Sequence, residues 1–262
     1  MAKRIKQTKT SRRHQSPSLI DNHLTRTAPT PAAKKPISAL NDAQRKYIRA
    51  IASNTLTFGT GPAGTGKTFV CGALAAAALA EGLTERIIIT RPAVEAGRGL
   101  GFLPGELEEK FDPYFEPFKD VLEERLGSGM VEYSIKAGKI QAKPLEYMRG
   151  KTFKDAWVIL DEAQNTTPIQ MKLFLTRIGE SCTVIVNGDL AQKDIRGRSG
   201  LEDAIKRLYD MPDVAFVEFT KADIVRSGLV QEIVERYEDM GTAEDDGGEG
   251  LRELPAFIHG GR

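Results

Sequence analysis

Residues 61–68, read Gly-Pro-Ala-Gly-Thr-Gly-Lys-Thr, match the phosphate-loop pattern G-x-x-x-x-G-K-[ST]. Glycines allow the backbone to wrap with its N–H groups pointing at an anion, and the helix that follows adds its positive N-terminus. We expect Lys67 to contact the β- and γ-phosphates and the Thr68 hydroxyl to bind Mg²⁺. The predicted nucleotide-binding residues of the loop are Gly61, Pro62, Ala63, Gly64, Thr65, Gly66, Lys67 and Thr68.

Two adjacent carboxylates form the second group with clear chemistry. Asp161 and Glu162 follow a short apolar run at residues 156–160. An acid at the end of a buried strand can hold Mg²⁺, as a Walker B acid does, and its neighbour can polarise the water that attacks the γ-phosphate. The alternative is a pair of solvated acids at a strand end. A hydrolase needs a second acid in this place, whereas a nucleotide kinase does not.

Three further side chains are candidates because of where they fall in the pattern. Gln192 follows the expected strand 183–186 and could sense the γ-phosphate, or belong to an ordinary turn. Gln44 could read an adenine edge, because its amide both donates and accepts, or it could complete a helix cap begun by Asn41. Arg226 could serve as an arginine finger on a neighbouring subunit, or form a surface ion pair.

Alternating strand and helix patterns surround these residues. We expect buried strands at 56–58, 86–90, 156–160, 183–186 and 214–219, and helices at 41–53, 68–80, 112–126, 168–178, 199–209 and 227–237. Residues 131–143 suggest a small hairpin or an added strand. The glycine-rich stretch 97–105 is either a nucleic-acid contact or a long connection. This order predicts an α/β fold with a mainly parallel sheet flanked by helices.

Charge is unevenly distributed over the 262 residues. The net charge is +1, but residues 1–40 contain nine Lys or Arg and one acid, which leaves a net charge of −7 on the rest. We expect residues 1–40 to be a disordered arm that either tethers nucleic-acid phosphates or acts as a solubilising tail, residues 41–237 to form one domain, and residues 238–262 to be an acidic, glycine-rich flexible tail.

The cysteine count and the hydropathy limit other classes of protein. Cys71 and Cys182 fall in an expected helix and strand, which indicates core residues in a reducing compartment. No apolar run approaches a membrane span, and the basic N-terminus lacks the apolar stretch of a secretory signal. The sequence therefore predicts a cytoplasmic protein.

Taken together, these motifs resemble the PhoH family, phosphate-starvation-type ATPases related to superfamily 1 helicases, from about Asn41 to Tyr237. The phosphate loop alone is not specific, but the ordered set is. Besides residues 61–68, it comprises Thr-Arg-Pro-Ala-Val-Glu-Ala-Gly at 90–97, Leu-Gly-Phe-Leu-Pro-Gly at 100–105, Pro-Leu-Glu-Tyr-Met-Arg-Gly at 144–150, Leu-Asp-Glu-Ala-Gln-Asn at 160–165, Gly-Asp-Leu-Ala-Gln at 188–192, Ser-Gly-Leu at 199–201 and Asp-Ile-Val-Arg-Ser at 223–227.

The resemblance implies a single RecA-like P-loop NTPase domain that hydrolyses ATP with Mg²⁺ and acts in RNA metabolism. It also implies a homo-oligomer, a hexameric ring, with sites between subunits. Under it, Gln44 is the adenine reader, Asp161 and Glu162 the Walker B pair, Gln192 the γ-phosphate sensor and Arg226 the arginine finger. Nothing after residue 237 resembles the nuclease or RNA-binding domain that some members carry.

The expected function is therefore a Mg²⁺-dependent ATPase that acts with nucleic acid, RNA rather than DNA, with helicase activity dependent on oligomerisation because one RecA-like domain is present. Two alternatives stay open: a nucleic-acid-binding module that ATP switches with little turnover, and a nucleotide kinase.

Overall fold

A computed structural model of the chain describes residues 36–92, 107–148, 150, 152–225, 228–230, 232–233 and 236. Its centre is a six-stranded sheet in the order β3-β2-β4-β5-β1-β6, in which every neighbouring pair is parallel. The strands are β1 (Leu56–Thr60), β2 (Arg86–Arg91), β3 (Ile140–Pro144), β4 (Ala156–Leu160), β5 (Thr183–Gly188) and β6 (Val214–Glu218).

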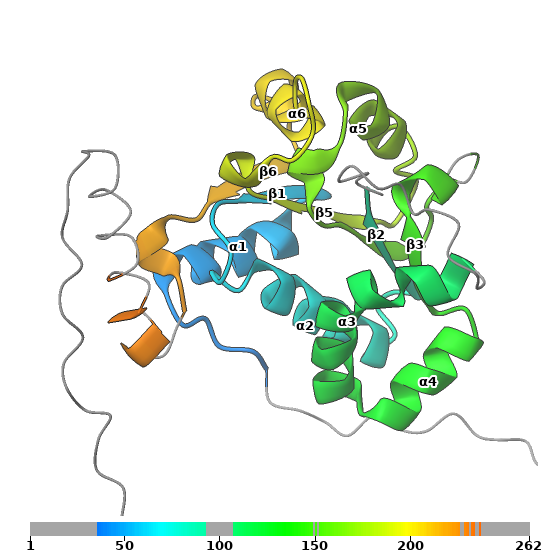
Figure 1. The fold of residues 1–262 in the computed structure, drawn as a ribbon. Coiled ribbons are helices and arrows are strands. Elements are labelled where there is room, and N and C mark those ends of the chain that lie inside the picture. The colour runs from blue at the N-terminus through cyan, green and yellow to red at the C-terminus, as the bar shows by residue number, and fades with distance from the viewer. Residues whose placement is uncertain are drawn as a thin grey trace, which may run out of the picture.

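Helices cover both faces of this sheet (Figure 1). One layer contains α1 (Asp42–Ser53), α2 (Lys67–Ala80), α3 (Leu107–Leu126) and α4 (Ser128–Lys136), and the other contains α5 (Pro168–Leu175) and α6 (Gly200–Leu208). The described residues also contain short 3-10 turns, at η1 (Leu145–Met148), η2 (Ala163–Asn165), η3 (Leu190–Gln192) and η4 (Lys221–Asp223).

Alternating strand residues divide the core into two clusters. Ile87, Ile89 and Ile159 face the layer of α1, α2 and α3, whereas Ile88 and Val158 face α5 and α6. Both sets are almost fully buried. A strand that packs on both faces must be apolar throughout, which explains the uninterrupted apolar runs in the sequence. The predicted α/β fold with a mainly parallel sheet is confirmed.

Most predicted elements are present, with one clear error. The sequence suggested a small hairpin within residues 131–143, but Ser128–Lys136 form a helix and Ile140–Pro144 form a strand parallel to β2. Val131 and Ser134 are buried at the i, i+3 spacing of a helix face, and Gly138 has a φ of 69°, which favours a turn between helix and strand. The alternative prediction, an added strand, is correct for β3.

Helix ends follow the expected chemistry. Asn41 caps α1 by accepting a hydrogen bond from the Gln44 backbone N–H at 2.8 Å. Thr167 caps α5 in a complete capping box with Gln170. Cys71 and Cys182 are buried, as predicted for core residues. Within the described residues no helix is both long and apolar enough to cross a membrane.

Candidate nucleotide-binding site

The phosphate loop joins β1 to α2 at the carboxyl edge of the sheet, where ligands of open α/β folds bind. Gly61, Gly64 and Gly66 have φ angles of 127°, 79° and 86°, in the region that glycine adopts readily. At Gly61 a β-carbon would also lie 2.1 Å from the Phe219 carbonyl oxygen. Only glycine therefore fits at this position.

Helix α2 begins without a side-chain cap, because its N-cap residue is Gly66. The first N–H groups of a helix need partners, and they carry the positive end of the helix dipole. Leaving them without a side-chain acceptor suits an anionic ligand such as a phosphate.

Lys67 contacts the loop itself. Its Nζ donates to the carbonyl oxygens of Gly61 and Pro62, at 2.6 and 2.8 Å, and lies 3.3 Å from the Thr65 hydroxyl. Burial lowers the pKa of Lys67, and the carboxylates of Asp189 and Asp161 oppose this shift. The ammonium group thus lies in a partly buried pocket lined by acidic side chains. The oxygens of a bound phosphate could replace the Gly61 and Pro62 carbonyl oxygens as its partners.

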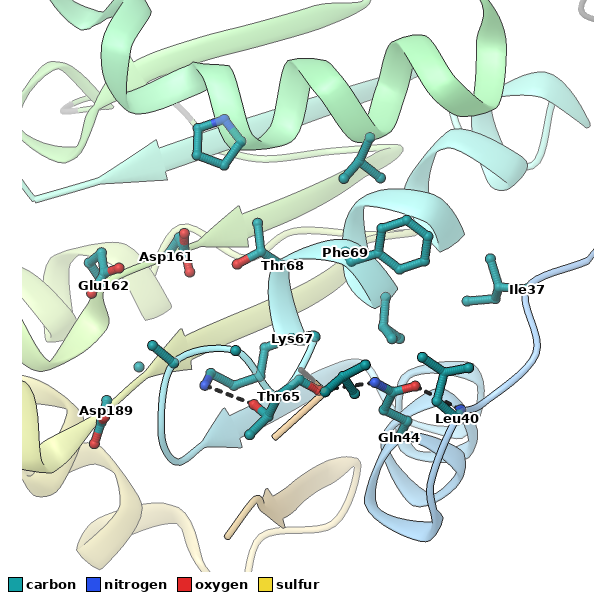
Figure 2. A pocket seen from close by; sticks show the side chains of 18 of the residues that line it. Ile37, Leu40, Gln44, Thr65, Lys67, Thr68, Phe69, Asp161, Glu162 and Asp189 are labelled. Carbon is teal, nitrogen blue, oxygen red and sulfur yellow. Dashed lines mark hydrogen bonds between the residues drawn. The ribbon is translucent and has the colours of Figure 1, made fainter. Parts of the chain in front are cut away.

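The pocket around the loop has a volume of about 770 Å³ and two chemically different ends. Asp161, Glu162 and Asp189 lie at one end, and the apolar side chains of Ile37 and Phe69 lie at the other (Figure 2). An acidic end that could hold a cation and an apolar end that could hold a base match the two halves of a nucleotide.

The acidic end contains the donor set that a hard cation prefers. Asp161 is buried at the end of β4, and in Figure 2 the Thr68 hydroxyl points toward its carboxylate. A hydroxyl, a carboxylate and phosphate oxygens are suitable Mg²⁺ ligands. Thr68 and Asp161 therefore fit the metal role that the sequence predicts, and Mg²⁺ bound there would neutralise charge on the phosphates.

Arg91, which was singled out from the sequence only as part of the motif at 90–97, pairs with the buried Asp161. Its Nη2 and Nε lie 2.5 and 3.1 Å from Asp161 Oδ2, and the two side chains are 13% and 6% exposed. Burial raises the pKa of Asp161, and the Arg91 guanidinium partly offsets that rise. The guanidinium also lies over the ring of Phe118 in α3. Arg91 thus supplies a positive charge to the carboxylate.

Gln44 lies at the pocket wall with both ends of its amide engaged. Its Oε1 accepts from the Leu40 N–H at 2.9 Å, and its Nε2 donates to the Thr65 carbonyl oxygen at 3.0 Å. Asn41 caps α1 through the Gln44 backbone N–H, but the Gln44 side chain accepts from Leu40 and not from Asn41, so the capping box that the sequence offered as an alternative does not form. The side chain supports the phosphate loop instead. The adenine-reading role stays a prediction. Residues 36–40, which the sequence analysis placed in the basic arm, reach this pocket, and Ile37 packs against the core.

Glu162 and Gln192 also line the pocket, as predicted. Glu162 is exposed and has a φ of 54°, which is unusual for a residue other than glycine. Gln192 is exposed in η3. The roles assigned to these side chains stay predictions. Arg226 and the glycine-rich stretch 97–105 lie outside the described residues.

Two buried amides near the pocket escaped the sequence analysis. Asn187, at the end of β5, accepts from the Tyr47 hydroxyl at 2.5 Å and donates to Cys71 Sγ at 3.3 Å. Gln164 lies between Glu162 and the start of the η3 segment. In the sequence each of these amides is only a polar residue in a segment expected to be buried. That pattern does not show which residue the amide contacts.

Comparison with known proteins agrees with these motifs. The sequence profile of the PhoH-like protein family matches residues 36–238. Protein PhoH of Escherichia coli K12 is 52% identical over 206 residues, which cover 77% of this chain and 58% of that protein. A PhoH-like protein of Bacillus subtilis is 46% identical over 223 residues, or 84% and 69% of the two chains. The chain thus spans little more than half the length of the first of these relatives.

The matches among solved structures are more distant. The large terminase of bacteriophage HK97 has a TM-score of 0.48 at 15% identity, over 81% of this chain and 50% of that chain. Pif1 helicase from Candida albicans has a TM-score of 0.42 at 15% identity, over 80% and 47%. The family profile, the close relatives and the phosphate-loop geometry agree, and the chain belongs to the PhoH-like protein family.

Proposed function

We propose that this chain is a Mg²⁺-dependent ATP hydrolase. The observation that carries the proposal is the convergence, at one end of a single pocket, of the phosphate loop with the two Walker B acids. Lys67 and the N-terminus of α2 would bind and orient the phosphates, and Thr68 with Asp161 would hold the metal. Mg²⁺ would supply charge neutralisation on the β- and γ-oxygens.

Glu162 is the candidate that orients and polarises the attacking water. Its exposed carboxylate lies at the acidic end of the pocket, where it could accept a proton from the attacking water. Gln192 lines the same pocket and would contact the γ-phosphate. The second acid at this place supports a hydrolase over a kinase, because a kinase would use a second substrate as the nucleophile.

The nucleic-acid partner is the second part of the proposal. We propose RNA rather than DNA because of the family resemblance, and a hexameric ring in which Arg226 of one subunit completes the site of the next. The excess of positive charge in residues 1–40 supports binding to a polyanion. Removing residues 1–35, which leaves the pocket residues 36–40 in place, should weaken RNA affinity and flatten its salt dependence. Unchanged RNA binding would refute the tether.

Phosphate release from ATP tests the enzymatic proposal directly. Turnover would be measured with Mg²⁺ for the wild type, Lys67→Ala and Glu162→Gln, each with no polymer, with single-stranded RNA and with single-stranded DNA. We expect turnover in the wild type, its loss in both variants, and stronger stimulation by RNA. A wild type that binds ATP without releasing phosphate under any of these conditions would instead identify an ATP-switched binding module.

A further inference from the structure

Gln164 is a buried amide that contacts both the proposed catalytic acid and the segment after β5. Its side chain is 1% exposed, so its polar atoms must find partners within the protein. We propose that Gln164 is a positioning residue that holds the Glu162 carboxylate in its reactive orientation and links that orientation to the η3 segment. This inference rests on the proposed hydrolase.

The hydrogen bonds of Gln164 fix the orientation of its amide. Its Nε2 donates to Glu162 Oε2 at 2.6 Å, and its Oε1 accepts from the Asp189 backbone N–H at 3.0 Å. A carboxylate only accepts and a backbone N–H only donates, so a flipped amide would lose both bonds. Gln164 can thus fill this place in one orientation only.

The surroundings of Gln164 leave it little room to move. A β-carbon on Gly188 would lie 2.8 Å from Gln164 Oε1 and 3.1 Å from its backbone nitrogen. The Ser199 hydroxyl donates to the Gln164 carbonyl oxygen at 2.8 Å, which anchors the backbone as well. The absence of a side chain at Gly188 is what allows the amide to approach the end of β5.

Glu162 needs such a partner because its own surroundings do not define its position. Its side chain is exposed, and a free glutamate side chain loses rotamer entropy when it is fixed. Its left-handed backbone adds a strain that the flanking structure must offset. A charge-assisted hydrogen bond from a rigid, buried amide selects one orientation in advance.

The same amide makes Glu162 sensitive to the segment that follows β5. Gln164 Nε2 also lies 3.4 Å from the Gln192 carbonyl oxygen, and Asp189 and Gln192 both line the nucleotide pocket. A displacement of this segment would therefore move the amide and, with it, the carboxylate. Because the side-chain hydrogen bonds of Gln164 reach neither the phosphate loop nor the apolar end of the pocket, we expect Gln164 to affect chemistry more than nucleotide binding.

Gln164→Met tests this role, with Asn165→Leu as its matched control. Asn165 is also a buried amide, and its side chain exchanges two hydrogen bonds with Asp194, at 2.8 and 3.2 Å. Its bond to Glu162 runs from its backbone N–H to the Glu162 carbonyl oxygen, at 3.0 Å, and does not involve the side chain that the substitution changes. Each substitution keeps the approximate side-chain size and removes one buried amide. In single-turnover ATP hydrolysis we expect Gln164→Met to lower the rate constant 10- to 100-fold, with nucleotide Kd changed less than twofold, since small misplacement of a catalytic group has effects of this size.

The control should lower the rate constant less than threefold. Equal losses in the two variants, or a loss in Gln164→Met that appears in Kd and not in the rate constant, would refute a positioning role. A double-mutant cycle adds a second criterion. In the Glu162→Gln variant, the further substitution Gln164→Met should change the residual rate less than twofold. An additive loss would show that Gln164 acts elsewhere.

Gln164→Glu keeps the test decisive if the methionine variant does not fold. It retains the acceptor for the Asp189 N–H and replaces the donor to Glu162 with a repelling carboxylate. We expect the same fall in rate constant with unchanged Kd, and a wild-type rate in this variant would overturn the proposal. A wild type without turnover would instead disprove the hydrolase itself, which separates the two failures.

Discussion

Replacing Arg91 with Met should destabilise the protein in a manner that depends on pH. The substitution removes the positive charge beside Asp161 but keeps a long side chain that can still pack over Phe118. Removing one partner of a buried ion pair costs about 3–5 kcal/mol because it leaves an uncompensated charge. Arg91 is slightly exposed, so we take about 3 kcal/mol as the expected loss at pH 8.

Protonation limits this loss at lower pH. Protonating a carboxyl whose unfolded pKa is near 3.9 costs about 1.5 kcal/mol at pH 5. The variant can therefore lose no more than this amount of stability at that pH, because Asp161 would become neutral instead. Burial already raises the pKa of Asp161, and losing Arg91 raises it further. A carboxyl with a raised folded pKa contributes stability that is present below its unfolded pKa and is lost as pH rises through the folded pKa. The deficit of the variant must therefore grow from pH 5 to pH 8.

Urea unfolding of the metal-free protein at pH 5, 6.5 and 8 measures this deficit. Arg86→Met is the matched control, because Arg86 lies on the same strand but forms an exposed pair with Glu85 at 3.5 Å. Exposed pairs contribute less than about 1 kcal/mol, and the control should show no pH trend. If Arg91→Met and Arg86→Met lost equal stability, or if the deficit shrank as pH rose, the electrostatic argument would be wrong.

Three further outcomes follow from contacts near the pocket. Tyr47→Phe should destabilise the protein by about 2 kcal/mol in urea unfolding, because it removes a buried donor from Asn187, and a loss under 0.5 kcal/mol would contradict this. Thr68→Val should weaken binding of Mg²⁺·ATP at least tenfold in calorimetry but change binding of metal-free ATP little, since the hydroxyl serves the metal; equal losses would place it on phosphate instead. Gly61→Ala should abolish nucleotide binding or folding, as its β-carbon meets backbone, and a normal melting temperature with normal binding would refute that.

The fold was largely predictable because its strongest signals are local. An apolar run such as residues 86–90 can be satisfied only where both faces of a strand are covered, so it indicates a parallel sheet between helices. Residues 131–143 do not reveal their structure in the sequence, because a short helix and a short strand present similar alternations over five residues. The glycine at position 138 indicates a turn, but the sequence does not show that this turn separates a helix from a strand.

The site was predictable only where chemistry repeats a fixed pattern. The spacing of the phosphate loop and the adjacent acids at 161 and 162 could be proposed from the sequence, because both follow patterns that nucleotide chemistry repeats. Arg91 and Gln164 differ because their importance comes from a partner. Gln164 contacts Glu162 two residues away along the chain, but it meets Asp189 because β4 and β5 are neighbours in the sheet. Arg91 meets Asp161 because β2 and β4 are adjacent and parallel, with Thr90 opposite Leu160.

This distinction explains what the two partner-dependent residues do. Arg91 and Gln164 each hold one acid of the 161–162 pair, from opposite sides of the chemistry: a cation stabilises the buried Asp161, and an amide orients the exposed Glu162. Burial of Asp161 makes a compensating charge necessary, whereas Glu162 is open to water and gains from Gln164 a fixed orientation. Two neighbouring carboxylates that are each held by a dedicated partner argue that the placement of these carboxylates matters, and the Arg91 and Gln164 variants test the two halves of that argument separately.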